Sequence, residues 1–282
     1  MKVGIFDSGY GGLTILEQIR KRLPEYDYIY LGDNARAPYG THSFEVIYRY
    51  TRESVEYLLR EGCALVILAC NTASAKALRT IQQKDLPRMR CIGLNDQIPN
   101  VLGVIRPTVE EVVKLTRNGH IGVAGTPGTV NSGSYVLELR KQREDLHITQ
   151  QACPMWVPLI ENGEHNGGGA DYFVEKYLRE LFAQDPLIDT LILGCTHYPL
   201  LIDKIEAALP GIAGQDVAIV SQGEIVAESL ERYLIRHGEM RSKLSMGGTC
   251  LYLTTESADK FAETACGFLH TPVPAEHITL SV

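Results

Sequence analysis

The sequence predicts an α/β fold of two similar doubly wound domains with mostly parallel sheets. Short apolar segments alternate with amphipathic helical patterns along nearly all of the 282 residues, as they do when helices cover both faces of a parallel sheet. A chain of this length provides about two domains of roughly 100–200 residues each. Residues 64–72 and 190–197 also repeat one pattern of a buried strand, a small residue, a cysteine and polar residues that begin a helix. Because of this repeat, we expect two related halves that face one another.

Short apolar runs are predicted to be strands, and most of them contain no polar residue. Between these strands, apolar residues recur at helical spacing over 44–59, where Ser43 is the expected N-cap. The same spacing predicts helices over 13–23, ended by Pro24, and over 173–182. The predicted strands are residues 3–6, 28–31, 64–69, 91–94, 121–124, 191–193, 217–220 and 251–253.

Two segments that contain proline predict the domain boundaries. Pro99 and Pro107 break the alternating pattern, which predicts one boundary near residues 95–106. A second boundary is predicted near 210–214, after which the chain would rejoin the first domain. The predicted domains are residues 1–97 with 210–282, which form a discontinuous domain, and residues 98–209.

Charge and composition disfavour several classes of protein. Lys and Arg number 27 against 34 Asp and Glu, for a net charge of −7, whereas duplex-binding domains usually carry a basic surplus, so no nucleic-acid partner is expected. No apolar run approaches the roughly 20 residues that span a bilayer. Asp7 comes too early for a signal peptide, so we expect a cytoplasmic protein with no membrane partner. The 7 cysteines include no Cys-x-x-Cys pair and are expected to be reduced thiols.

Ligands of open α/β sheets bind beyond the carboxyl ends of the strands, and two cysteines are predicted to lie there. Cys70 and Cys195 each follow a predicted strand. The partial positive charge of a helix N-terminus favours the thiolate form of a nearby cysteine. Most cysteines are simply buried, but two in matching contexts indicate a shared chemical role. The remaining cysteines lack this context and are interpreted as structural: Cys63, Cys91, Cys153, Cys250 and Cys266.

Polar residues follow other predicted strands. Asp7 and Ser8 begin a glycine-rich turn that has neither the dinucleotide fingerprint nor the P-loop pattern. An acid at this position would repel phosphate, so Asp7 is better placed to orient an ammonium group or a neighbouring acid or base; a helix-capping turn is the alternative. The loop of Tyr39 and Gly40 is suited to bind a carboxylate. His197, two residues after Cys195, is placed to tune the protonation of that thiol.

Three chemistries are compatible with these residues. Asp7, Cys70, Cys195 and His197 form a conceivable zinc ligand set, although they come from different strands without a close pair. A hydrolase that uses either cysteine as nucleophile with His197 is also conceivable. Neither alternative accounts for two equivalent cysteines. Inversion of an α-carbon does, because a base on one face removes the proton while an acid on the other face returns it, and no cofactor is needed.

Several strings of residues resemble those of a known family. The chain is similar to the bacterial glutamate racemases of the aspartate/glutamate racemase family over residues 3 to about 201. Its Cys-Asn-Thr and Cys-Thr-His strings favour glutamate over a related racemase of aspartate or of a hydantoin. A non-catalytic binding protein for acidic amino acids is the alternative outside the enzymes. The strings are DSGYGGLT at 7–14, GDNARAPYG at 32–40, ACNTASA at 69–75, GVAGTPGTV at 122–130 and GCTHYPL at 194–200.

This resemblance implies a cofactor-independent racemase that interconverts L- and D-glutamate. It implies a supply of D-glutamate for peptidoglycan, and so for cell-wall biogenesis and cell shape. The active site is expected in the cleft between the two domains, with a small-molecule substrate, no metal and a homodimer. Carried over by position, Cys70 and Cys195 are the proton donor and acceptor, with Asp7 and His197 assisting. The residues implied to line the substrate site are Asp7, Ser8, Tyr39, Gly40, Asn71, Thr72, Thr196 and His197.

Two further positions enter through the resemblance. Glu161 matches an acid that the family carries near its pocket. Many members have Asp-Ser where this sequence has Ser221-Gln222. This departure lies outside the cysteine motifs, so it bears on regulation, assembly and pocket-edge contacts more than on the reaction.

Overall fold

The computed structural model describes residues 1–91 and 100–280, and the chain divides into two compact units. The first unit comprises Met1–Val104 and Gly223–Val282, and the second comprises Ile105–Gln222. The predicted boundary 209/210 precedes the second of these divisions in the chain, and the predicted boundary 97/98 lies outside the described residues. That each part folds as a domain of its own stays a prediction.

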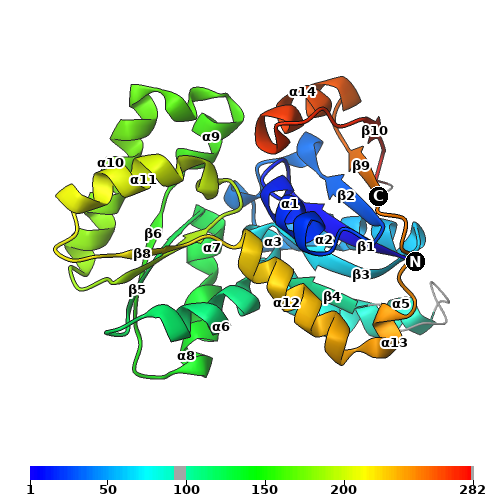
Figure 1. The fold of residues 1–282 in the computed structure, drawn as a ribbon, viewed down its shortest axis with the longest axis horizontal. Helices are drawn as coiled ribbons and strands as arrows, with labels where there is room; N and C mark the ends of the chain where they lie inside the picture. Colours follow the sequence, from blue (N-terminus) through cyan, green and yellow to red (C-terminus); the bar gives the residue numbers. More distant parts are fainter. Residues whose placement is uncertain (92–99, 281–282) are drawn as a thin grey trace. The chain divides into compact units, whose positions relative to one another are not determined.

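The first unit is built on a parallel sheet with strand order β10-β9-β2-β1-β3-β4 (Figure 1). Its central strands are buried on both faces, which explains why their sequences are almost uninterrupted apolar runs. The strands are β1 (Lys2–Asp7), β2 (Tyr28–Gly32), β3 (Cys63–Leu68), β4 (Asn100–Gly103), β9 (Cys250–Thr254) and β10 (Ala275–His277).

The second unit is built on a parallel sheet with strand order β6-β5-β7-β8. Numbered within its own unit, this order is second, first, third, fourth, which is also the order of β2, β1, β3 and β4. The predicted fold class is therefore confirmed, and the internal repeat of the sequence corresponds to a repeat of topology. The strands are β5 (His120–Gly125), β6 (His147–Ala152), β7 (Thr190–Gly194) and β8 (Ala218–Val220).

Helices connect the strands and cover the sheets. In the first unit α1 packs against α12 and α14, and α2 packs on β1, β2 and β3. The helices of this unit are α1 (Leu13–Arg22), α2 (Phe44–Arg60), α3 (Asn71–Lys76), α4 (Leu78–Thr80), α5 (Leu86–Cys91), α12 (Gly223–Arg236), α13 (Gly238–Arg241) and α14 (Ala258–Leu269). Those of the second unit are α6 (Ile105–Leu115), α7 (Pro127–Ser132), α8 (Ser134–Gln142), α9 (Trp156–Glu161), α10 (Gly168–Gln184) and α11 (Ile202–Ala208).

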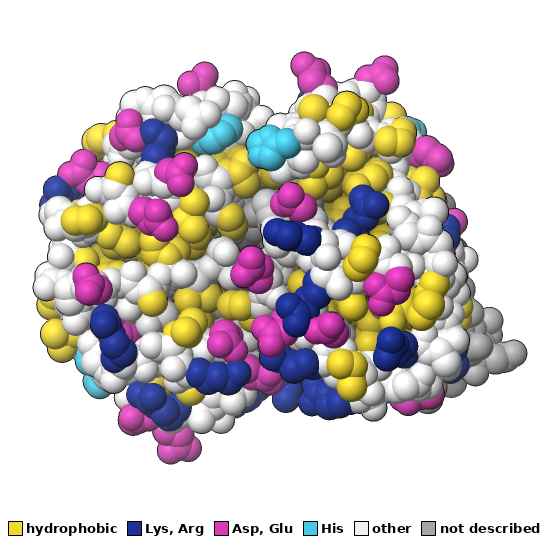
Figure 2. All heavy atoms as spheres, viewed as in Figure 1, with side chains coloured by type: hydrophobic (Ala, Val, Ile, Leu, Met, Phe, Trp, Pro, Cys, Tyr) yellow, Lys and Arg dark blue, Asp and Glu magenta, His cyan; other side chains and the backbone are white. Residues whose placement is uncertain are grey.

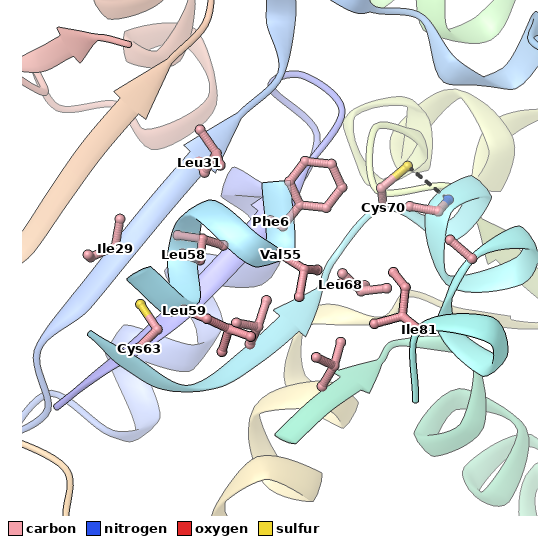
Figure 3. Close-up of a cluster of buried hydrophobic side chains, with 14 of the residues drawn as sticks. Phe6, Ile29, Leu31, Val55, Leu58, Leu59, Cys63, Leu68, Cys70 and Ile81 are labelled. Carbon is pink, nitrogen blue, oxygen red and sulfur yellow. Dashed lines mark hydrogen bonds between the residues drawn. The ribbon is translucent and has the colours of Figure 1, made fainter. Parts of the chain in front are cut away.

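A hydrophobic core under α2 supports the strand ends of the first unit (Figure 3). Val55 and Leu58 of α2 belong to one buried cluster with Phe6 of β1 and Leu68 of β3. Each such side chain contributes about 1.5–3 kcal/mol when it is fully buried. Cys70, just beyond β3, lies at the border of this cluster (Figure 3). The strand ends that carry the candidate site therefore rest on a packed core.

The local patterns predict most of these elements correctly. Ser43 is the N-cap of α2, where its hydroxyl accepts a hydrogen bond from the Val46 N–H. The exception among the predicted strands is 91–94, because Cys91 is the last residue of α5 and residues 92–94 lie outside the described residues. Buried Leu86 and Met89, three residues apart, follow helical spacing. Strands β4, β6 and β10 were not predicted; they are short or polar in sequence.

Acidic and basic side chains are interspersed on the face that Figure 2 shows. None of the helices in the described part of the chain combines the length and apolar character that crossing a bilayer requires.

Candidate active site

Each unit carries one of the two singled-out cysteines just beyond the carboxyl end of its third strand. Cys70 follows β3 in the first unit, and Cys195 follows β7 in the second. In both sheets this strand pairs with the first strand of the unit, at the point where the strand order reverses. Open α/β sheets bind ligands at such a switch point. The two thiols therefore occupy matching places in two similar sheets.

Cys70 is held by hydrogen-bonding groups at the start of α3. It is the N-cap of that helix, and its Sγ accepts from the Ala73 N–H over 3.5 Å (Figure 3). The Ser8 Oγ lies 3.4 Å from the same Sγ. Only 5% of Cys70 is exposed. Donors around a buried sulfur stabilise its thiolate form, so this thiol is equipped to lose and regain a proton.

The predicted neighbours of Cys70 lie at the same edge of the sheet. Asp7 is the last residue of β1, and its Oδ2 accepts from the Gly9 N–H at 2.9 Å. Asn71 and Thr72 form the first turn of α3 and are buried. Gly12 is required by the tight turn after β1, because a Cβ at this position would lie 2.5 Å from the Asp7 Cβ. The structure thus groups these predicted polar residues with the first thiol.

A buried network anchors the loop of Tyr39 and Gly40. The Tyr39 hydroxyl donates to the Asp33 carboxylate, which also accepts from Arg36 Nε at 2.7 Å and Thr255 Oγ1 at 2.9 Å. Burial raises the pKa of Tyr39, and the charge of Asp33 raises it further. The Tyr39 hydroxyl therefore keeps its proton, and its bond to Asp33 fixes the position of the loop.

Asp33, Arg36 and Thr255 had no predicted role. Asp33 and Arg36 belong to the string at 32–40 that carries the family resemblance, so this string could have indicated them as site residues. Their importance depends on tertiary contacts, because Thr255 lies beyond β9 and Arg36 also pairs with Glu53 of α2 at 2.5 Å. Such contacts between distant parts of the chain leave no local pattern.

Cys195 has a different set of partners. Its Sγ lies 3.8 Å from His197 Nδ1, and His197 Nε2 lies 3.0 Å from Glu161 Oε1 at the end of α9. Cys195, Thr196 and His197 are all buried. A thiol, an imidazole and a carboxylate thus form one continuous chain. Glu161, which entered only through the resemblance, is the residue that orients His197.

His197 carries a strongly perturbed pKa. Burial alone lowers the pKa of this imidazole, but the hydrogen bonds and negative charges of Cys195 and Glu161 raise it to about 10. His197 is therefore a cation at neutral pH. The imidazolium lies between the Cys195 sulfur and the Glu161 carboxylate and contacts both.

Glu161→Gln is expected to lower the pKa of His197 by roughly one to three pH units, because a neutral amide replaces a charge at 3.0 Å. His197 loses its proton as the pH rises through its pKa. When the pH is raised, a catalytic rate that needs the cation would therefore begin to decrease at a lower pH in the variant than in the wild type. NMR titration of the His197 ring and the pH dependence of kcat measure both effects. Glu164→Gln, at an exposed neighbouring position, is the control. An unchanged titration in Glu161→Gln would contradict this account.

The helix argument applies to the two cysteines unequally. Cys70 directly precedes α3, whereas Thr196 and His197 separate Cys195 from the 3-10 helix at Tyr198–Leu201. The first thiol therefore has an N-terminal helix N–H as its partner, and the second has an imidazole. The sequence repeat predicts equivalent positions, but the supporting groups differ.

Three of the other cysteines have thiol pKa values that are raised by burial. The cysteines with described side chains are all free. Burial raises the pKa of Cys63 to about 12 and that of Cys250 to about 11, and it also raises the pKa of Cys153. These thiols stay protonated at neutral pH, in agreement with a structural role. Among the described residues, no three His, Cys, Asp or Glu side chains gather as a metal site would require.

Comparison with known proteins connects this geometry to one family. Residues 13–222 match the family model described as Asp/Glu/Hydantoin racemase. A glutamate racemase of Ruegeria sp. (strain TM1040) is 39% identical over 286 residues, which cover 98% of this chain and 99% of that protein.

Solved structures are similar over nearly the whole chain. A glutamate racemase from Francisella tularensis, in complex with D-glutamate, has a TM-score of 0.84 and 30% identity, covering 99% of this chain and 97% of that chain. The Escherichia coli glutamate racemase, in complex with L-glutamate and the activator UDP-MurNAc-ala, has a TM-score of 0.73 and 26% identity, covering 98% and 97%.

Proposed function

Since this chain belongs to the Asp/Glu/Hydantoin racemase family and is an amino-acid racemase, we propose that it interconverts L- and D-glutamate with Cys70 and Cys195 as its two proton-transfer groups. The observation that carries the proposal is the matching placement of the two thiols. Each follows the third strand of its unit, and each has partners that stabilise a thiolate. Relatives described as glutamate racemases, with D- or L-glutamate bound, support the choice of substrate.

The proposed reaction consists of two proton transfers and changes no oxidation state. The thiolate of one cysteine takes the α-proton, so the C–H bond breaks and an S–H bond forms. The thiol of the other cysteine then donates its proton to the opposite face of the α-carbon, and that cysteine becomes a thiolate. The enantiomer bound decides which cysteine acts as base. After one turnover the two sulfurs have exchanged their protonation states.

The surrounding polar residues are proposed to hold the substrate and its developing charge. Asp7 offers a negative charge to the substrate ammonium group. Asn71, Thr72 and Thr196 offer donors to a carboxylate that gains electron density as the proton leaves. His197 keeps Cys195 ready to act as base. The full proposed substrate site is Asp7, Ser8, Tyr39, Gly40, Asn71, Thr72, Thr196 and His197.

The proposed cellular role follows from the product. D-Glutamate is supplied for peptidoglycan in the cytoplasm, where the protein acts as a homodimer. The proposed assembly is testable by sedimentation, which would give twice the chain mass of 31.2 kDa.

The circular-dichroism signal of L-glutamate is expected to decay to zero when the protein is added with a thiol reductant and no cofactor. D-Glutamate should decay in the same way, because the two enantiomers are mirror images and their equilibrium mixture has no net signal. Aspartate, under the same conditions, is the control for the substrate. Decay with aspartate but not with glutamate would overturn the substrate assignment, and saturable glutamate binding without any decay would favour a binding protein.

A further inference from the structure

A buried hydrogen-bonded group lies beneath the loop that carries Cys195. Gln222, just after β8, is 2% exposed, and its Nε2 donates to Thr108 Oγ1 at 2.9 Å and to the Tyr135 hydroxyl at 3.0 Å. Thr108 and Tyr135 come from α6 and α8 and are fully buried. Both amide hydrogens of Gln222 are therefore used, and three separate elements of the second unit are joined at one point.

Tyr135 connects this group to the strand end before Cys195. A Cβ placed on Gly194 would lie 3.2 Å from Tyr135 Cε2 and 2.9 Å from the Ala124 carbonyl oxygen. Gly194 is thus packed between the ring and the neighbouring strand β5. Since Gly194 immediately precedes Cys195, the position of the ring limits where the Cys195 backbone can lie.

The hydroxyl of Tyr135 is also electrostatically coupled to Cys195. Burial raises the pKa of Tyr135, and negative charge on Cys195 raises it further, so the phenol keeps its proton. Because the hydroxyl accepts from Gln222, its own hydrogen is directed away from that amide. The phenol dipole therefore has a set orientation near Cys195.

We propose that Tyr135 and Gln222 are positioning residues for proton transfer by Cys195. Tyr135 supports the strand end on which Cys195 stands, and Gln222 holds the Tyr135 hydroxyl in place. The inference rests on the proposed function, because it assumes that Cys195 transfers a proton. It gives a role to Gln222, because in this chain the long amide spans from α6 to α8.

Tyr135→Phe and Gln222→Leu are the variants that test this role. Each should lower kcat about tenfold with little change in KM, which is the effect of one lost hydrogen bond in positioning. Tyr28→Phe is the matched control, because this buried tyrosine also loses a hydrogen bond, from its hydroxyl to the Leu23 carbonyl at 2.6 Å, in the other unit. It should keep the kcat of the wild type.

The deciding measurement is α-proton exchange in deuterated water, for each enantiomer separately. When Cys195 is impaired, the enantiomer deprotonated by Cys70 regains a proton from Cys70 more often than from Cys195. Exchange without inversion therefore rises for that enantiomer alone. Cys195→Ser identifies which enantiomer this is, and both positioning variants should show the same asymmetry, with a several-fold higher ratio of exchange to inversion.

The possible results are distinguishable. Wild-type kcat and wild-type exchange ratios in both variants would overturn the inference, and so would a slower rate with equal ratios for the two enantiomers. If Tyr135→Phe does not fold, Gln222→Leu decides alone. If Cys195→Ser racemises glutamate at the wild-type rate, the proposed function itself has failed, and the inference fails with it.

Discussion

Replacement of either Cys70 or Cys195 by serine is expected to lower the rate of racemisation by about 100- to 10,000-fold, the range typical of a lost general acid or base. Serine preserves the size of the side chain, but its hydroxyl does not ionise near neutral pH as a thiol of pKa about 8.5 does. Both positions are needed, because each turnover uses one group to remove the proton and the other to return it. The decay of the circular-dichroism signal of either enantiomer measures the loss.

Cys63→Ser is the matched control for these variants. Cys63 begins β3, the strand that Cys70 follows, and it is fully buried with its pKa raised to about 12. Serine at this position should affect stability but leave kcat within a few-fold of the wild type. If Cys70→Ser or Cys195→Ser matches the wild-type rate, the two-thiol mechanism is wrong.

Asp189→Ala is expected to lower the free energy of unfolding by about 2–4 kcal/mol, because it leaves buried hydrogen-bond donors without their acceptor. Asp189 is 2% exposed and lies just before β7. Its Oδ1 accepts from the hydroxyls of Thr116 and Thr190, and its Oδ2 accepts from the backbone N–H groups of Arg117 and Asn118. Alanine would leave all four donors without this acceptor. Urea unfolding measures the change.

The effect of Asp189→Ala should depend on pH in a defined direction. Burial alone raises the pKa of Asp189, but the hydrogen bonds from Thr116, Asn118, Thr190 and Arg117 outweigh it and lower the pKa below 3.8. The folded state therefore binds this proton less readily than the unfolded chain. The stabilisation is complete above the ordinary pKa and is lost as pH falls through the folded value.

The difference in stability between wild type and Asp189→Ala should accordingly narrow in acid. Asp145→Ala is the control in the same unit, because Asp145 is exposed and its pair with Arg143 is a surface pair, worth about 0–1 kcal/mol. If Asp189→Ala lowers the free energy of unfolding by less than about 1 kcal/mol, the hydrogen bonds to Asp189 do not stabilise the fold as expected. Asp189 stands at the opposite end of β7 from Cys195, so kcat should change little while the variant stays folded.

Features that depend on interactions between residues close in the sequence were predicted more successfully than features that depend on distant residues. Ser43 and the strand before Cys70 are visible in local patterns, because capping and burial act within a few residues. Strand β6 was missed because its His-Ile-Thr-Gln-Gln-Ala sequence lacks the apolar run of a central strand, and β6 is an edge strand. The pattern of strand, cysteine and polar residues located the thiols for the same local reason.

The supporting groups of the site were harder to predict. Asp33 receives a bond from Thr255, and Gln222 reaches Thr108, across long stretches of chain. Glu161 became significant only when the fold brought it to His197. Side chains that act through a tertiary partner have no regular spacing in the sequence. Side chains that directly follow a predicted strand can be recognised from the local pattern.

The unequal partners of the two thiols have a thermodynamic consequence. Two mirror-image amino acids have identical free energy in water, so the ratio kcat/KM must be the same for both directions of a racemisation. No such law constrains kcat or KM singly. Cys70 has a hydroxyl and an amide beside it, and Cys195 has an imidazolium and a carboxylate. The asymmetry of the protein can therefore give the two enantiomers different values of kcat and of KM, while the ratio kcat/KM stays the same for both.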